Sequence, residues 1–504
     1  MRRLLLPTVL FALVAGACGA SAPTSRPADA GPPAHGYPTL RPEEPPPTPY
    51  DGVTFEDPGV NPFVDAAEDR ESTFGLDVDT ASYTIARRWI EDGNLPDPAS
   101  IRVEEFVNAF DQGYAAPESE TFAIHADGGP SPFLDEDEVL LRIGVKAREV
   151  GDRERPDAAL TFVVDVSGSM AREDRLELVK RALALLVEEL RPRDTVALVV
   201  YGSDARVVLE PTRARDADEI LAAIDALRPE GSTNAEAGLR LGYELAREAL
   251  AEGGINRVIL ASDGVANVGV TDAQGILDEI RRDADAGIQL VTVGFGMGNY
   301  NDVLLEQLAD DGDGFYAYVD QLDEARRLFV EDLTGTLQSV ALDARVQVEF
   351  NPDAVEAYRL IGFENRAIDD DDFRDDDVEA GAIGAGHAST ALYALRLERD
   401  AGRDARLATV SLRWTDPESR RADELAEDVY GSDLADSFRA TEPAFQLDAL
   451  VAAAAERLRD SRWGRRYDLR DVLDVADQVA RDLPETAQTS DFLSLLERAA
   501  ELER

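Results

Sequence analysis

The segment TFVVDVSGSM (161–170) joins an apolar strand pattern to three oxygen-bearing side chains at alternate positions. Asp165, Ser167 and Ser169 follow one another at intervals of two residues, and Gly168 permits a tight turn between the serines. One carboxylate and two hydroxyls are hard oxygen ligands, which suit Mg²⁺, Mn²⁺ or Ca²⁺ and are poor ligands for zinc. The sequence therefore predicts a divalent-cation site at the end of this strand.

Two later loops offer further oxygen ligands for the same cation. The segment GSTNAEAG (231–238) precedes a predicted helix and contributes Thr233, and ASDGVANVG (261–269) follows a predicted strand and contributes Asp263. In open α/β sheets, ligands bind beyond the carboxyl ends of the strands, where such loops meet. We therefore expect Thr233 and Asp263 to lie close to Asp165 and the two serines.

Strands and helices alternate strictly from about residue 157 to 335. The apolar runs suit buried parallel strands, and helices with one apolar face separate them. This alternation predicts a doubly wound α/β domain with a mostly parallel sheet and right-handed crossovers. The predicted strands are ALTFVVDV (159–166), TVALVVYG (195–202), RVILAS (257–262), IQLVTVGFG (288–296) and GFYAYV (314–319).

Two segments of different character flank this domain. Residues 53–150 combine short helical patterns with alternating strands and predict an N-terminal α+β segment. Residues 336–504 predict a C-terminal domain that is β-rich to about residue 415 and helical afterwards. We therefore expect a central domain with one folded segment on each side.

The first 52 residues have the composition of a leader followed by a linker. Residues 1–18 carry a basic start, a short apolar run and small residues before Cys18, as in a secretory signal peptide. Residues 19–52 are rich in Pro, Ala and Gly and predict an extended tether. Because Cys18 is the only cysteine of the chain, an internal disulfide is excluded.

The residues around Cys18 resemble the lipobox of bacterial lipoproteins, although Ala15 stands where a leucine is usual. The resemblance implies that Cys18 is lipidated, becomes the mature N-terminus and holds the protein at a membrane surface. A signal peptide that is cleaved without lipidation is the alternative. Gly19, in place of an aspartate, resembles the sorting pattern of enterobacterial outer-membrane lipoproteins. We therefore expect an anchored protein of the bacterial cell envelope, in the outer rather than the inner membrane, that is periplasmic or surface-exposed.

The complete set of Asp165, Ser167, Ser169, Thr233 and Asp263 resembles the metal-ion-dependent adhesion site (MIDAS) of von Willebrand factor type A domains. The resemblance implies a Rossmann-like fold with direct metal contacts from Ser167, Ser169 and Thr233. It implies that Asp165 and Asp263 act in part through bound water. An open coordination position would then accept a carboxylate from a partner protein.

The flanking segments carry a second resemblance. The motifs NPFV, STFGLDVDTASY and GAGHASTALYAL are similar to those of a group of bacterial envelope lipoproteins, in which a type A domain lies between an N-terminal segment and a C-terminal domain. Together with the adhesion-site resemblance, it predicts a metal-dependent protein-binding module for adhesion or scaffolding on an envelope lipoprotein, and we expect no enzymatic activity. The alternative is a structural envelope scaffold in which the metal only stabilises the loops.

Charge and histidine content exclude other classes of function. The formal net charge of −50, from 101 acidic and 51 basic residues, argues against a nucleic-acid partner because phosphates would be repelled. A Ser–His–Asp hydrolase is disfavoured because VDVSGSM lacks the G-x-S-x-G turn. The three histidines, His35, His125 and His387, also lie outside the predicted central domain.

Overall fold

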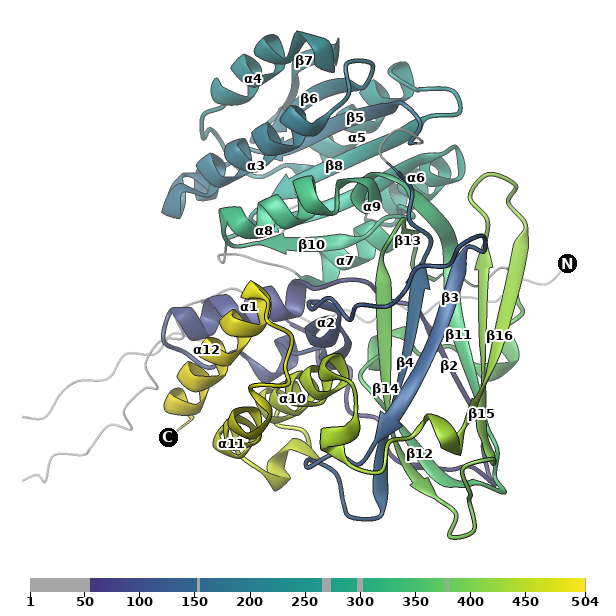
Figure 1. Ribbon diagram of the computed structural model, residues 1–504. Helices are drawn as coiled ribbons and strands as arrows, with labels where there is room; N and C mark the ends of the chain where they lie inside the picture. The colour runs from purple at the N-terminus through teal and green to yellow at the C-terminus, as the bar shows by residue number, and fades with distance from the viewer. Residues whose placement is uncertain are drawn as a thin grey trace, which may run out of the picture. The chain divides into compact units, whose positions relative to one another are not determined.

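Figure 1 shows the computed structural model of the chain. The predicted signal peptide, tether and Cys18 lie outside the described residues and stay predictions. All described residues belong to one structural unit. The structure describes residues 55–151, 155–264, 273–296, 302–376, 378 and 380–503.

A six-stranded sheet forms the core of the central domain (residues 155–337). Five of its strands are the predicted apolar runs, and they pair in parallel, as expected for strands joined by helical crossovers. The sixth strand, β7, is absent from the sequence prediction and pairs antiparallel with β6 at the sheet edge. In spatial order the strands are β10 (Tyr316–Val319), β9 (Ile288–Phe295), β8 (Ile255–Ser262), β5 (Ala158–Asp165), β6 (Thr195–Tyr201) and β7 (Ala205–Arg213).

Helices cover both faces of this sheet, which confirms the doubly wound α/β fold. Successive residues of β5 point to opposite faces, so that Phe162 and Val164 share a core with α3, α4, α8 and α9. Val163 lies in the core made with α5, α6 and α7. The helices are α3 (Arg175–Glu189), α4 (Ala217–Asp225), α5 (Ala235–Glu248), α6 (Ala273–Asp285), α7 (Asp302–Asp310), α8 (Leu322–Arg326) and α9 (Leu333–Leu337), with a π-helical turn η4 (Arg327–Glu331) between α8 and α9.

The segments before and after the central domain build one flanking body (residues 55–151 and 338–503). The first sheet combines strands from both segments in the order β1 (Val64–Asp65), β12 (Val355–Ile361), β14 (Ala388–Leu397), β4 (Glu138–Ala147) and β3 (Phe122–Gly129). The second has the order β13 (Ile383–Gly384), β11 (Ser339–Phe350), β15 (Arg406–Thr415) and β16 (Ala422–Tyr430), and β2 (Glu71–Gly75) also pairs with β11. The predicted N-terminal and C-terminal segments therefore complete each other's sheets.

The flanking body has two sheets and one layer of helices (Figure 1). Leu141 and Ile143 of β4 lie in the core between the sheets, and the neighbouring Leu140 lies in the core with the helices. None of the helices in the described part of the chain has the length and apolarity to cross a bilayer. The helices of this layer are α1 (Ala81–Glu91), α2 (Val103–Asn108), α10 (Pro443–Leu458), α11 (Leu469–Val479) and α12 (Ala487–Leu502).

Helix α1 joins the flanking body to the central domain. Ile85 and Trp89 lie in the core beneath the central sheet, whereas Tyr83 and Ile90 lie in the core of the helical layer. Residues four apart share one face of a helix, so α1 has an apolar face for each part. The two parts are therefore joined by a continuous hydrophobic contact.

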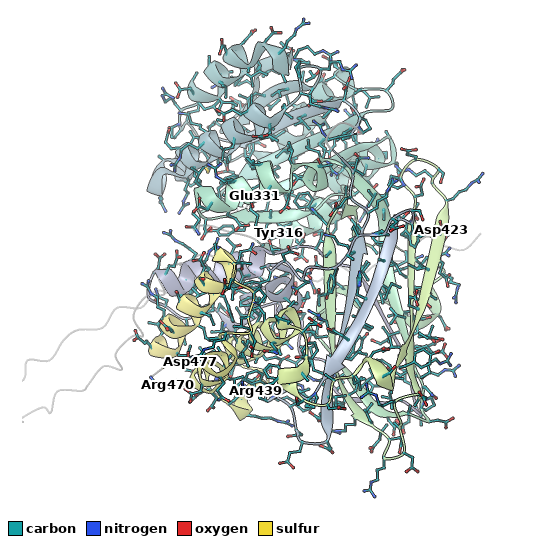
Figure 2. All side chains as sticks on the ribbon, in the orientation of Figure 1. Tyr316, Glu331, Asp423, Arg439, Arg470 and Asp477 are labelled. Atoms are coloured by element: carbon teal, nitrogen blue, oxygen red, sulfur yellow. The ribbon has the colours of Figure 1, made fainter. Side chains whose placement is uncertain are left out.

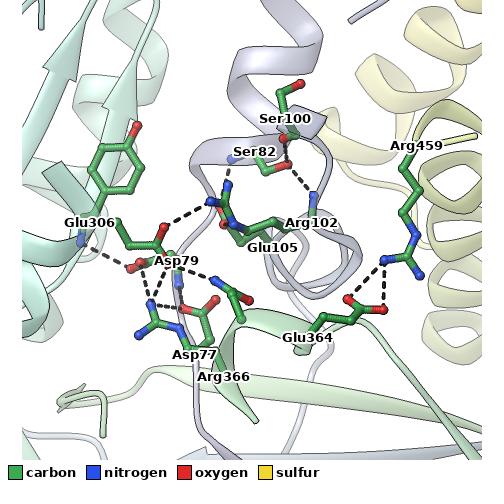
Figure 3. Close-up of polar contacts among 12 residues, drawn as sticks. Asp77, Asp79, Ser82, Ser100, Arg102, Glu105, Glu306, Glu364, Arg366 and Arg459 are labelled. Carbon is green, nitrogen blue, oxygen red and sulfur yellow. Dashed lines mark hydrogen bonds and ion pairs between the residues drawn. The ribbon is translucent and has the colours of Figure 1, made fainter. Parts of the chain in front are cut away.

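Buried charges add a second connection between the two parts (Figure 3). Arg366 of the flanking body lies 3.1 Å from Glu306 Oε1 and 2.8 Å from Asp310 Oδ2, both on α7 of the central domain. Arg102 Nη2 lies 3.2 Å from Glu306 Oε2. Asp79 Oδ1 accepts a hydrogen bond from the backbone N–H of Tyr316 at 3.3 Å, at the start of β10. Directed polar contacts thus fix how the central domain sits on the flanking body.

Candidate metal centre

Strand β5 places Asp165 at the carboxyl end of the central sheet. Its carboxylate is fully buried and is held from two sides. The backbone N–H of Ser167 donates to Oδ1 at 2.7 Å, and the Ser262 hydroxyl donates to Oδ2 at 3.1 Å. Burial raises the pKa of Asp165 to about 6, although these hydrogen bonds favour the ionised form and oppose part of the rise.

The serines and Asp263 lie in direct contact. Ser167 Oγ and Ser169 Oγ are 2.9 Å apart, and Ser169 Oγ donates to Asp263 Oδ1 at 3.0 Å. Asp263 follows β8, which pairs in parallel with β5, so both strands deliver their side chains to one edge. Four of the five residues predicted as ligands are thus joined by hydrogen bonds at the predicted edge of the sheet.

The loop that carries Thr233 lies against the serine turn. The backbone N–H of Gly168 donates to the Gly231 carbonyl at 3.2 Å, and that of Glu230 donates to the Val166 carbonyl at 2.5 Å. Thr233 follows two residues after Gly231 and is half-buried, and its hydroxyl makes no hydrogen bond within the described chain. The backbone therefore brings the third predicted loop to the same place and leaves this hydroxyl available.

Two residues of the site were not expected from the sequence. Ser262, the last residue of β8, holds Asp165, and Arg175, the first residue of α3, donates from Nη1 to Asp263 Oδ2 at 2.7 Å. The side chains of Arg175 and Asp263 are each 4% exposed. Ser262 could have been found from its place directly before Asp263 at a strand end. Arg175 carried no such signal, because a basic residue at the start of a helix is commonly solvent-exposed.

The donor set fits a hard cation. Two carboxylates and three hydroxyls supply only oxygen atoms, as Mg²⁺, Mn²⁺ and Ca²⁺ prefer. Among the residues that the structure describes, no three His, Cys, Asp or Glu side chains form a group that could hold a metal ion. A cation at this site would therefore rely on the hydroxyls as well as on Asp165 and Asp263.

The geometry gives no support to a serine hydrolase. His125 Nε2 is hydrogen-bonded to the Ala115 carbonyl at 2.9 Å, and His387 packs edge-on against Phe315. Neither of these histidines contacts Ser167 or Ser169 in the described chain. A histidine that could activate a serine nucleophile is thus missing from the described surroundings of the serines.

Comparison with known proteins gives three family matches along the chain. The model of the von Willebrand factor type A domain matches residues 159–332. A second von Willebrand factor model matches residues 50–142, and the model described as "Uncharacterized protein YfbK, C-terminal" matches residues 335–502.

Individual relatives share these segments to different extents. "Uncharacterized protein YfbK" of Escherichia coli (strain K12) is 35% identical over 464 residues, which cover 87% of this chain and 80% of that protein. "Uncharacterized protein sll0103" of Synechocystis sp. (strain ATCC 27184 / PCC 6803 / Kazusa) is 30% identical over 215 residues, covering 42% of this chain and 50% of the relative. The solved structure of a von Willebrand factor type A protein from Catenulispora acidiphila is 15% identical, covers 77% of this chain and 91% of that chain, and superposes with a TM-score of 0.44.

The similarity to YfbK runs through the central domain and the flanking body alike. The central domain is matched as a type A domain, a class commonly used for protein interaction and adhesion. The chain therefore belongs to the YfbK family of von Willebrand factor type A domain proteins.

Proposed function

We propose that this protein binds a divalent cation through Asp165, Ser167, Ser169, Thr233 and Asp263 and uses it to bind a carboxylate of a partner protein. The contact between the Ser167–Ser169 pair and Asp263 carries the proposal, because it joins hydroxyl and carboxylate ligands from two separate loops. A bound Mg²⁺, Mn²⁺ or Ca²⁺ would supply positive charge and a free coordination position.

The roles of the individual residues follow from their environments. Asp165 is held by Ser167 and Ser262, and its carboxylate would hold the cation at the end of β5. The hydroxyls of Ser167, Ser169 and Thr233 would supply neutral ligands, so that only Asp165 and Asp263 offset the charge of the cation before an outside carboxylate binds. The net charge of −50 makes such a cation useful, because an acidic partner would otherwise be repelled.

We further propose that the protein acts at the bacterial cell envelope, anchored through a lipid on Cys18 at the outer membrane. The residues around Cys18 and the Pro-rich stretch after them support this location. The second candidate is a structural scaffold in which the cation only stabilises the loops. The extensive pairing of strands from both ends of the chain favours a rigid flanking body that could serve such a role.

Cation binding is tested first by calorimetric titration of the intact chain with MgCl₂ and MnCl₂. We expect saturable binding to the wild type and none to Asp165→Ala. Bound cation should raise the melting temperature of the wild type alone, because only the folded state has the site. Equal shifts in the wild type and in Asp165→Ala would contradict the assignment of these ligands.

Bridging is then separated from scaffolding by capture from an envelope extract. If one partner binds with Mg²⁺ and is lost with EDTA or with Asp165→Ala, the carboxylate bridge is supported. If the same partner binds with EDTA and to Asp165→Ala, the scaffold is the better description and the bridge is wrong.

A further inference from the structure

A cavity of about 520 Å³ lies where the central domain meets the flanking body. Tyr316 and the π-helical turn line it from the central domain, and the end of β4, the start of β14 and the first turn of α12 line it from the flanking body. Sites for small ligands commonly measure about 300–1,000 Å³. Figure 2 shows Tyr316 and Glu331 on the side of the central domain that faces α1 and α12.

This cavity is separate from the metal centre. Asp165 is the last residue of β5, whereas Tyr316 is the first residue of β10. Strands β5, β8, β9 and β10 run parallel, so Asp165 lies at the carboxyl ends of the strands and Tyr316 lies at their amino ends. A ligand in the cavity would therefore not share residues with the proposed cation.

A lysine supplies positive charge to the cavity. Lys146, one of only two lysines in the chain, lies near the end of β4 and is half-buried. Its ammonium donates to the Gly386 carbonyl and forms no ion pair within the described chain. An ammonium has three donors, so Lys146 retains the capacity to bind an anion.

A buried nitrogen of the lining lacks a partner. His387 Nδ1 makes no hydrogen bond within the described chain. Unpaired buried polar atoms are uncommon and costly, which indicates that something else satisfies them.

The charges around His387 also favour an anion in the cavity. Burial and the nearby charges of Lys146, Arg327 and Arg257 lower the pKa of His387 to about 4. The imidazole is therefore neutral near pH 7. Arg327 is paired with Glu324 at 2.5 Å, which leaves Lys146 as the cation of the lining with no ion pair within the described chain. An anion bound there would offset these charges.

The mouth of the cavity has the opposite charge. Asp111, Glu331 and Asp332 all line the cavity and are exposed. A ligand with only negative charge would be repelled by these three carboxylates, whereas an ammonium would be attracted. The cavity therefore has a positive interior and a negative entrance.

We propose that this cavity binds a compact zwitterion of the amino-acid or short-peptide class, with its carboxylate on Lys146 and its ammonium at Glu331. The imidazole of His387 offers a further hydrogen bond to the ligand. This second binding activity goes beyond the proposed cation-dependent function and does not require it.

Histidine NMR with glycylglycine as the probe tests this proposal. The signal of His387 is assigned by elimination with His35→Gln and His125→Gln, and EDTA is present throughout so that cation binding plays no part. We expect saturable shifts of His387 and a rise of its pKa by about one unit or more, because a carboxylate within a few ångströms favours the imidazolium. Absence of saturable shifts would overturn the proposal.

Matched variants locate the two charges of the ligand. Lys146→Met should weaken glycylglycine binding at least about tenfold, as expected for a lost charge-assisted hydrogen bond, and Lys180→Met should leave it unchanged. Lys180 is a suitable control because it is the other lysine and pairs with Glu177 at 2.8 Å on α3. Glu331→Gln should weaken glycylglycine but not acetate. Equal affinity of Lys146→Met and wild type would contradict the assignment, as would acetate binding as tightly as glycylglycine.

Discussion

Replacement of Arg175 by glutamine tests the electrostatics of the proposed metal centre. Arg175 Nη1 lies 2.7 Å from Asp263 Oδ2, and both side chains are 4% exposed. In the absence of a cation, the guanidinium neutralises a carboxylate that has no access to bulk water. Arg175→Gln therefore leaves Asp263 charged, buried and held only by weaker hydrogen bonds.

The expected loss of stability is large. Removal of one partner from a buried ion pair costs about 3–5 kcal/mol. At about 2–4 °C per kcal/mol for a domain of this size, the melting temperature of the central domain should fall by roughly 6–20 °C without metal.

Mg²⁺ should restore much of this loss, because the bound cation gives Asp263 a new positive neighbour. The affinity of Arg175→Gln for Mg²⁺ should exceed that of the wild type, since the cation no longer competes with the guanidinium. At a concentration one hundred times the Kd, a bound cation stabilises the folded state by about 2.7 kcal/mol. Calorimetric titration and thermal melts with EDTA or MgCl₂ measure both effects.

Arg155→Gln is the matched control. Arg155 Nη2 lies 2.7 Å from Asp194 Oδ2, and their side chains are 2% and 0% exposed. This pair precedes β5 and β6 and thus lies at the amino ends of the strands, away from the metal centre. Arg155→Gln should also melt at a lower temperature, but Mg²⁺ should shift it no more than the wild type. Equal rescue of both variants, or an unchanged Mg²⁺ affinity of Arg175→Gln, would refute the reasoning.

Three further predictions concern the flanking body. Glu104 is 2% exposed, and burial, with the charges of Glu364 and Asp77, raises its pKa to about 7. Because the folded pKa lies above the unfolded one, the carboxyl destabilises the fold most above pH 7 and has no effect below about 4.5. Glu104→Gln should therefore raise the free energy of unfolding at pH 8 by up to about 3 kcal/mol, with a higher melting temperature. At pH 4.5 it should hardly change either quantity. Gly144→Ala should cost about 1–3 kcal/mol in denaturant unfolding, because its Cβ would lie 2.1 Å from the ring of Tyr114. Arg366→Met should cost about 3–5 kcal/mol and separate the calorimetric transitions of the two parts, since it removes the cation that Glu306 and Asp310 share and leaves Glu306 with Arg102 alone.

The buried parts of the central domain were predictable from the sequence. The apolar runs of β5, β6, β8, β9 and β10 and the convergence of Asp165 with Asp263 follow from general properties of parallel sheets. Strands β7 and β16 were not found, because both lie at sheet edges and are largely exposed. Their charged residues hide the alternation that identifies a strand, while their hydrogen bonds to the neighbouring strand still fix them.

Contacts between residues distant in sequence could not be predicted from the sequence. The pairing of β2 with β11 joins residues such as Phe74 and Val346, and neither strand contains information about which partner it takes. The same holds for Arg175, whose role depends on the position of Asp263 after folding. Local patterns thus predict which elements form, and long-range packing decides which of them meet.

The shared sheets of the flanking body impose an order on folding. All six strands of the central domain lie between Ala158 and Val319, so this domain can fold before the C-terminal part of the chain has emerged. Strand β4, in contrast, cannot complete its pairing until β14 emerges, more than two hundred residues later. Until then β2 and β4 have open edges that can join those of other nascent chains, so the early part of the chain is the part that most needs a chaperone.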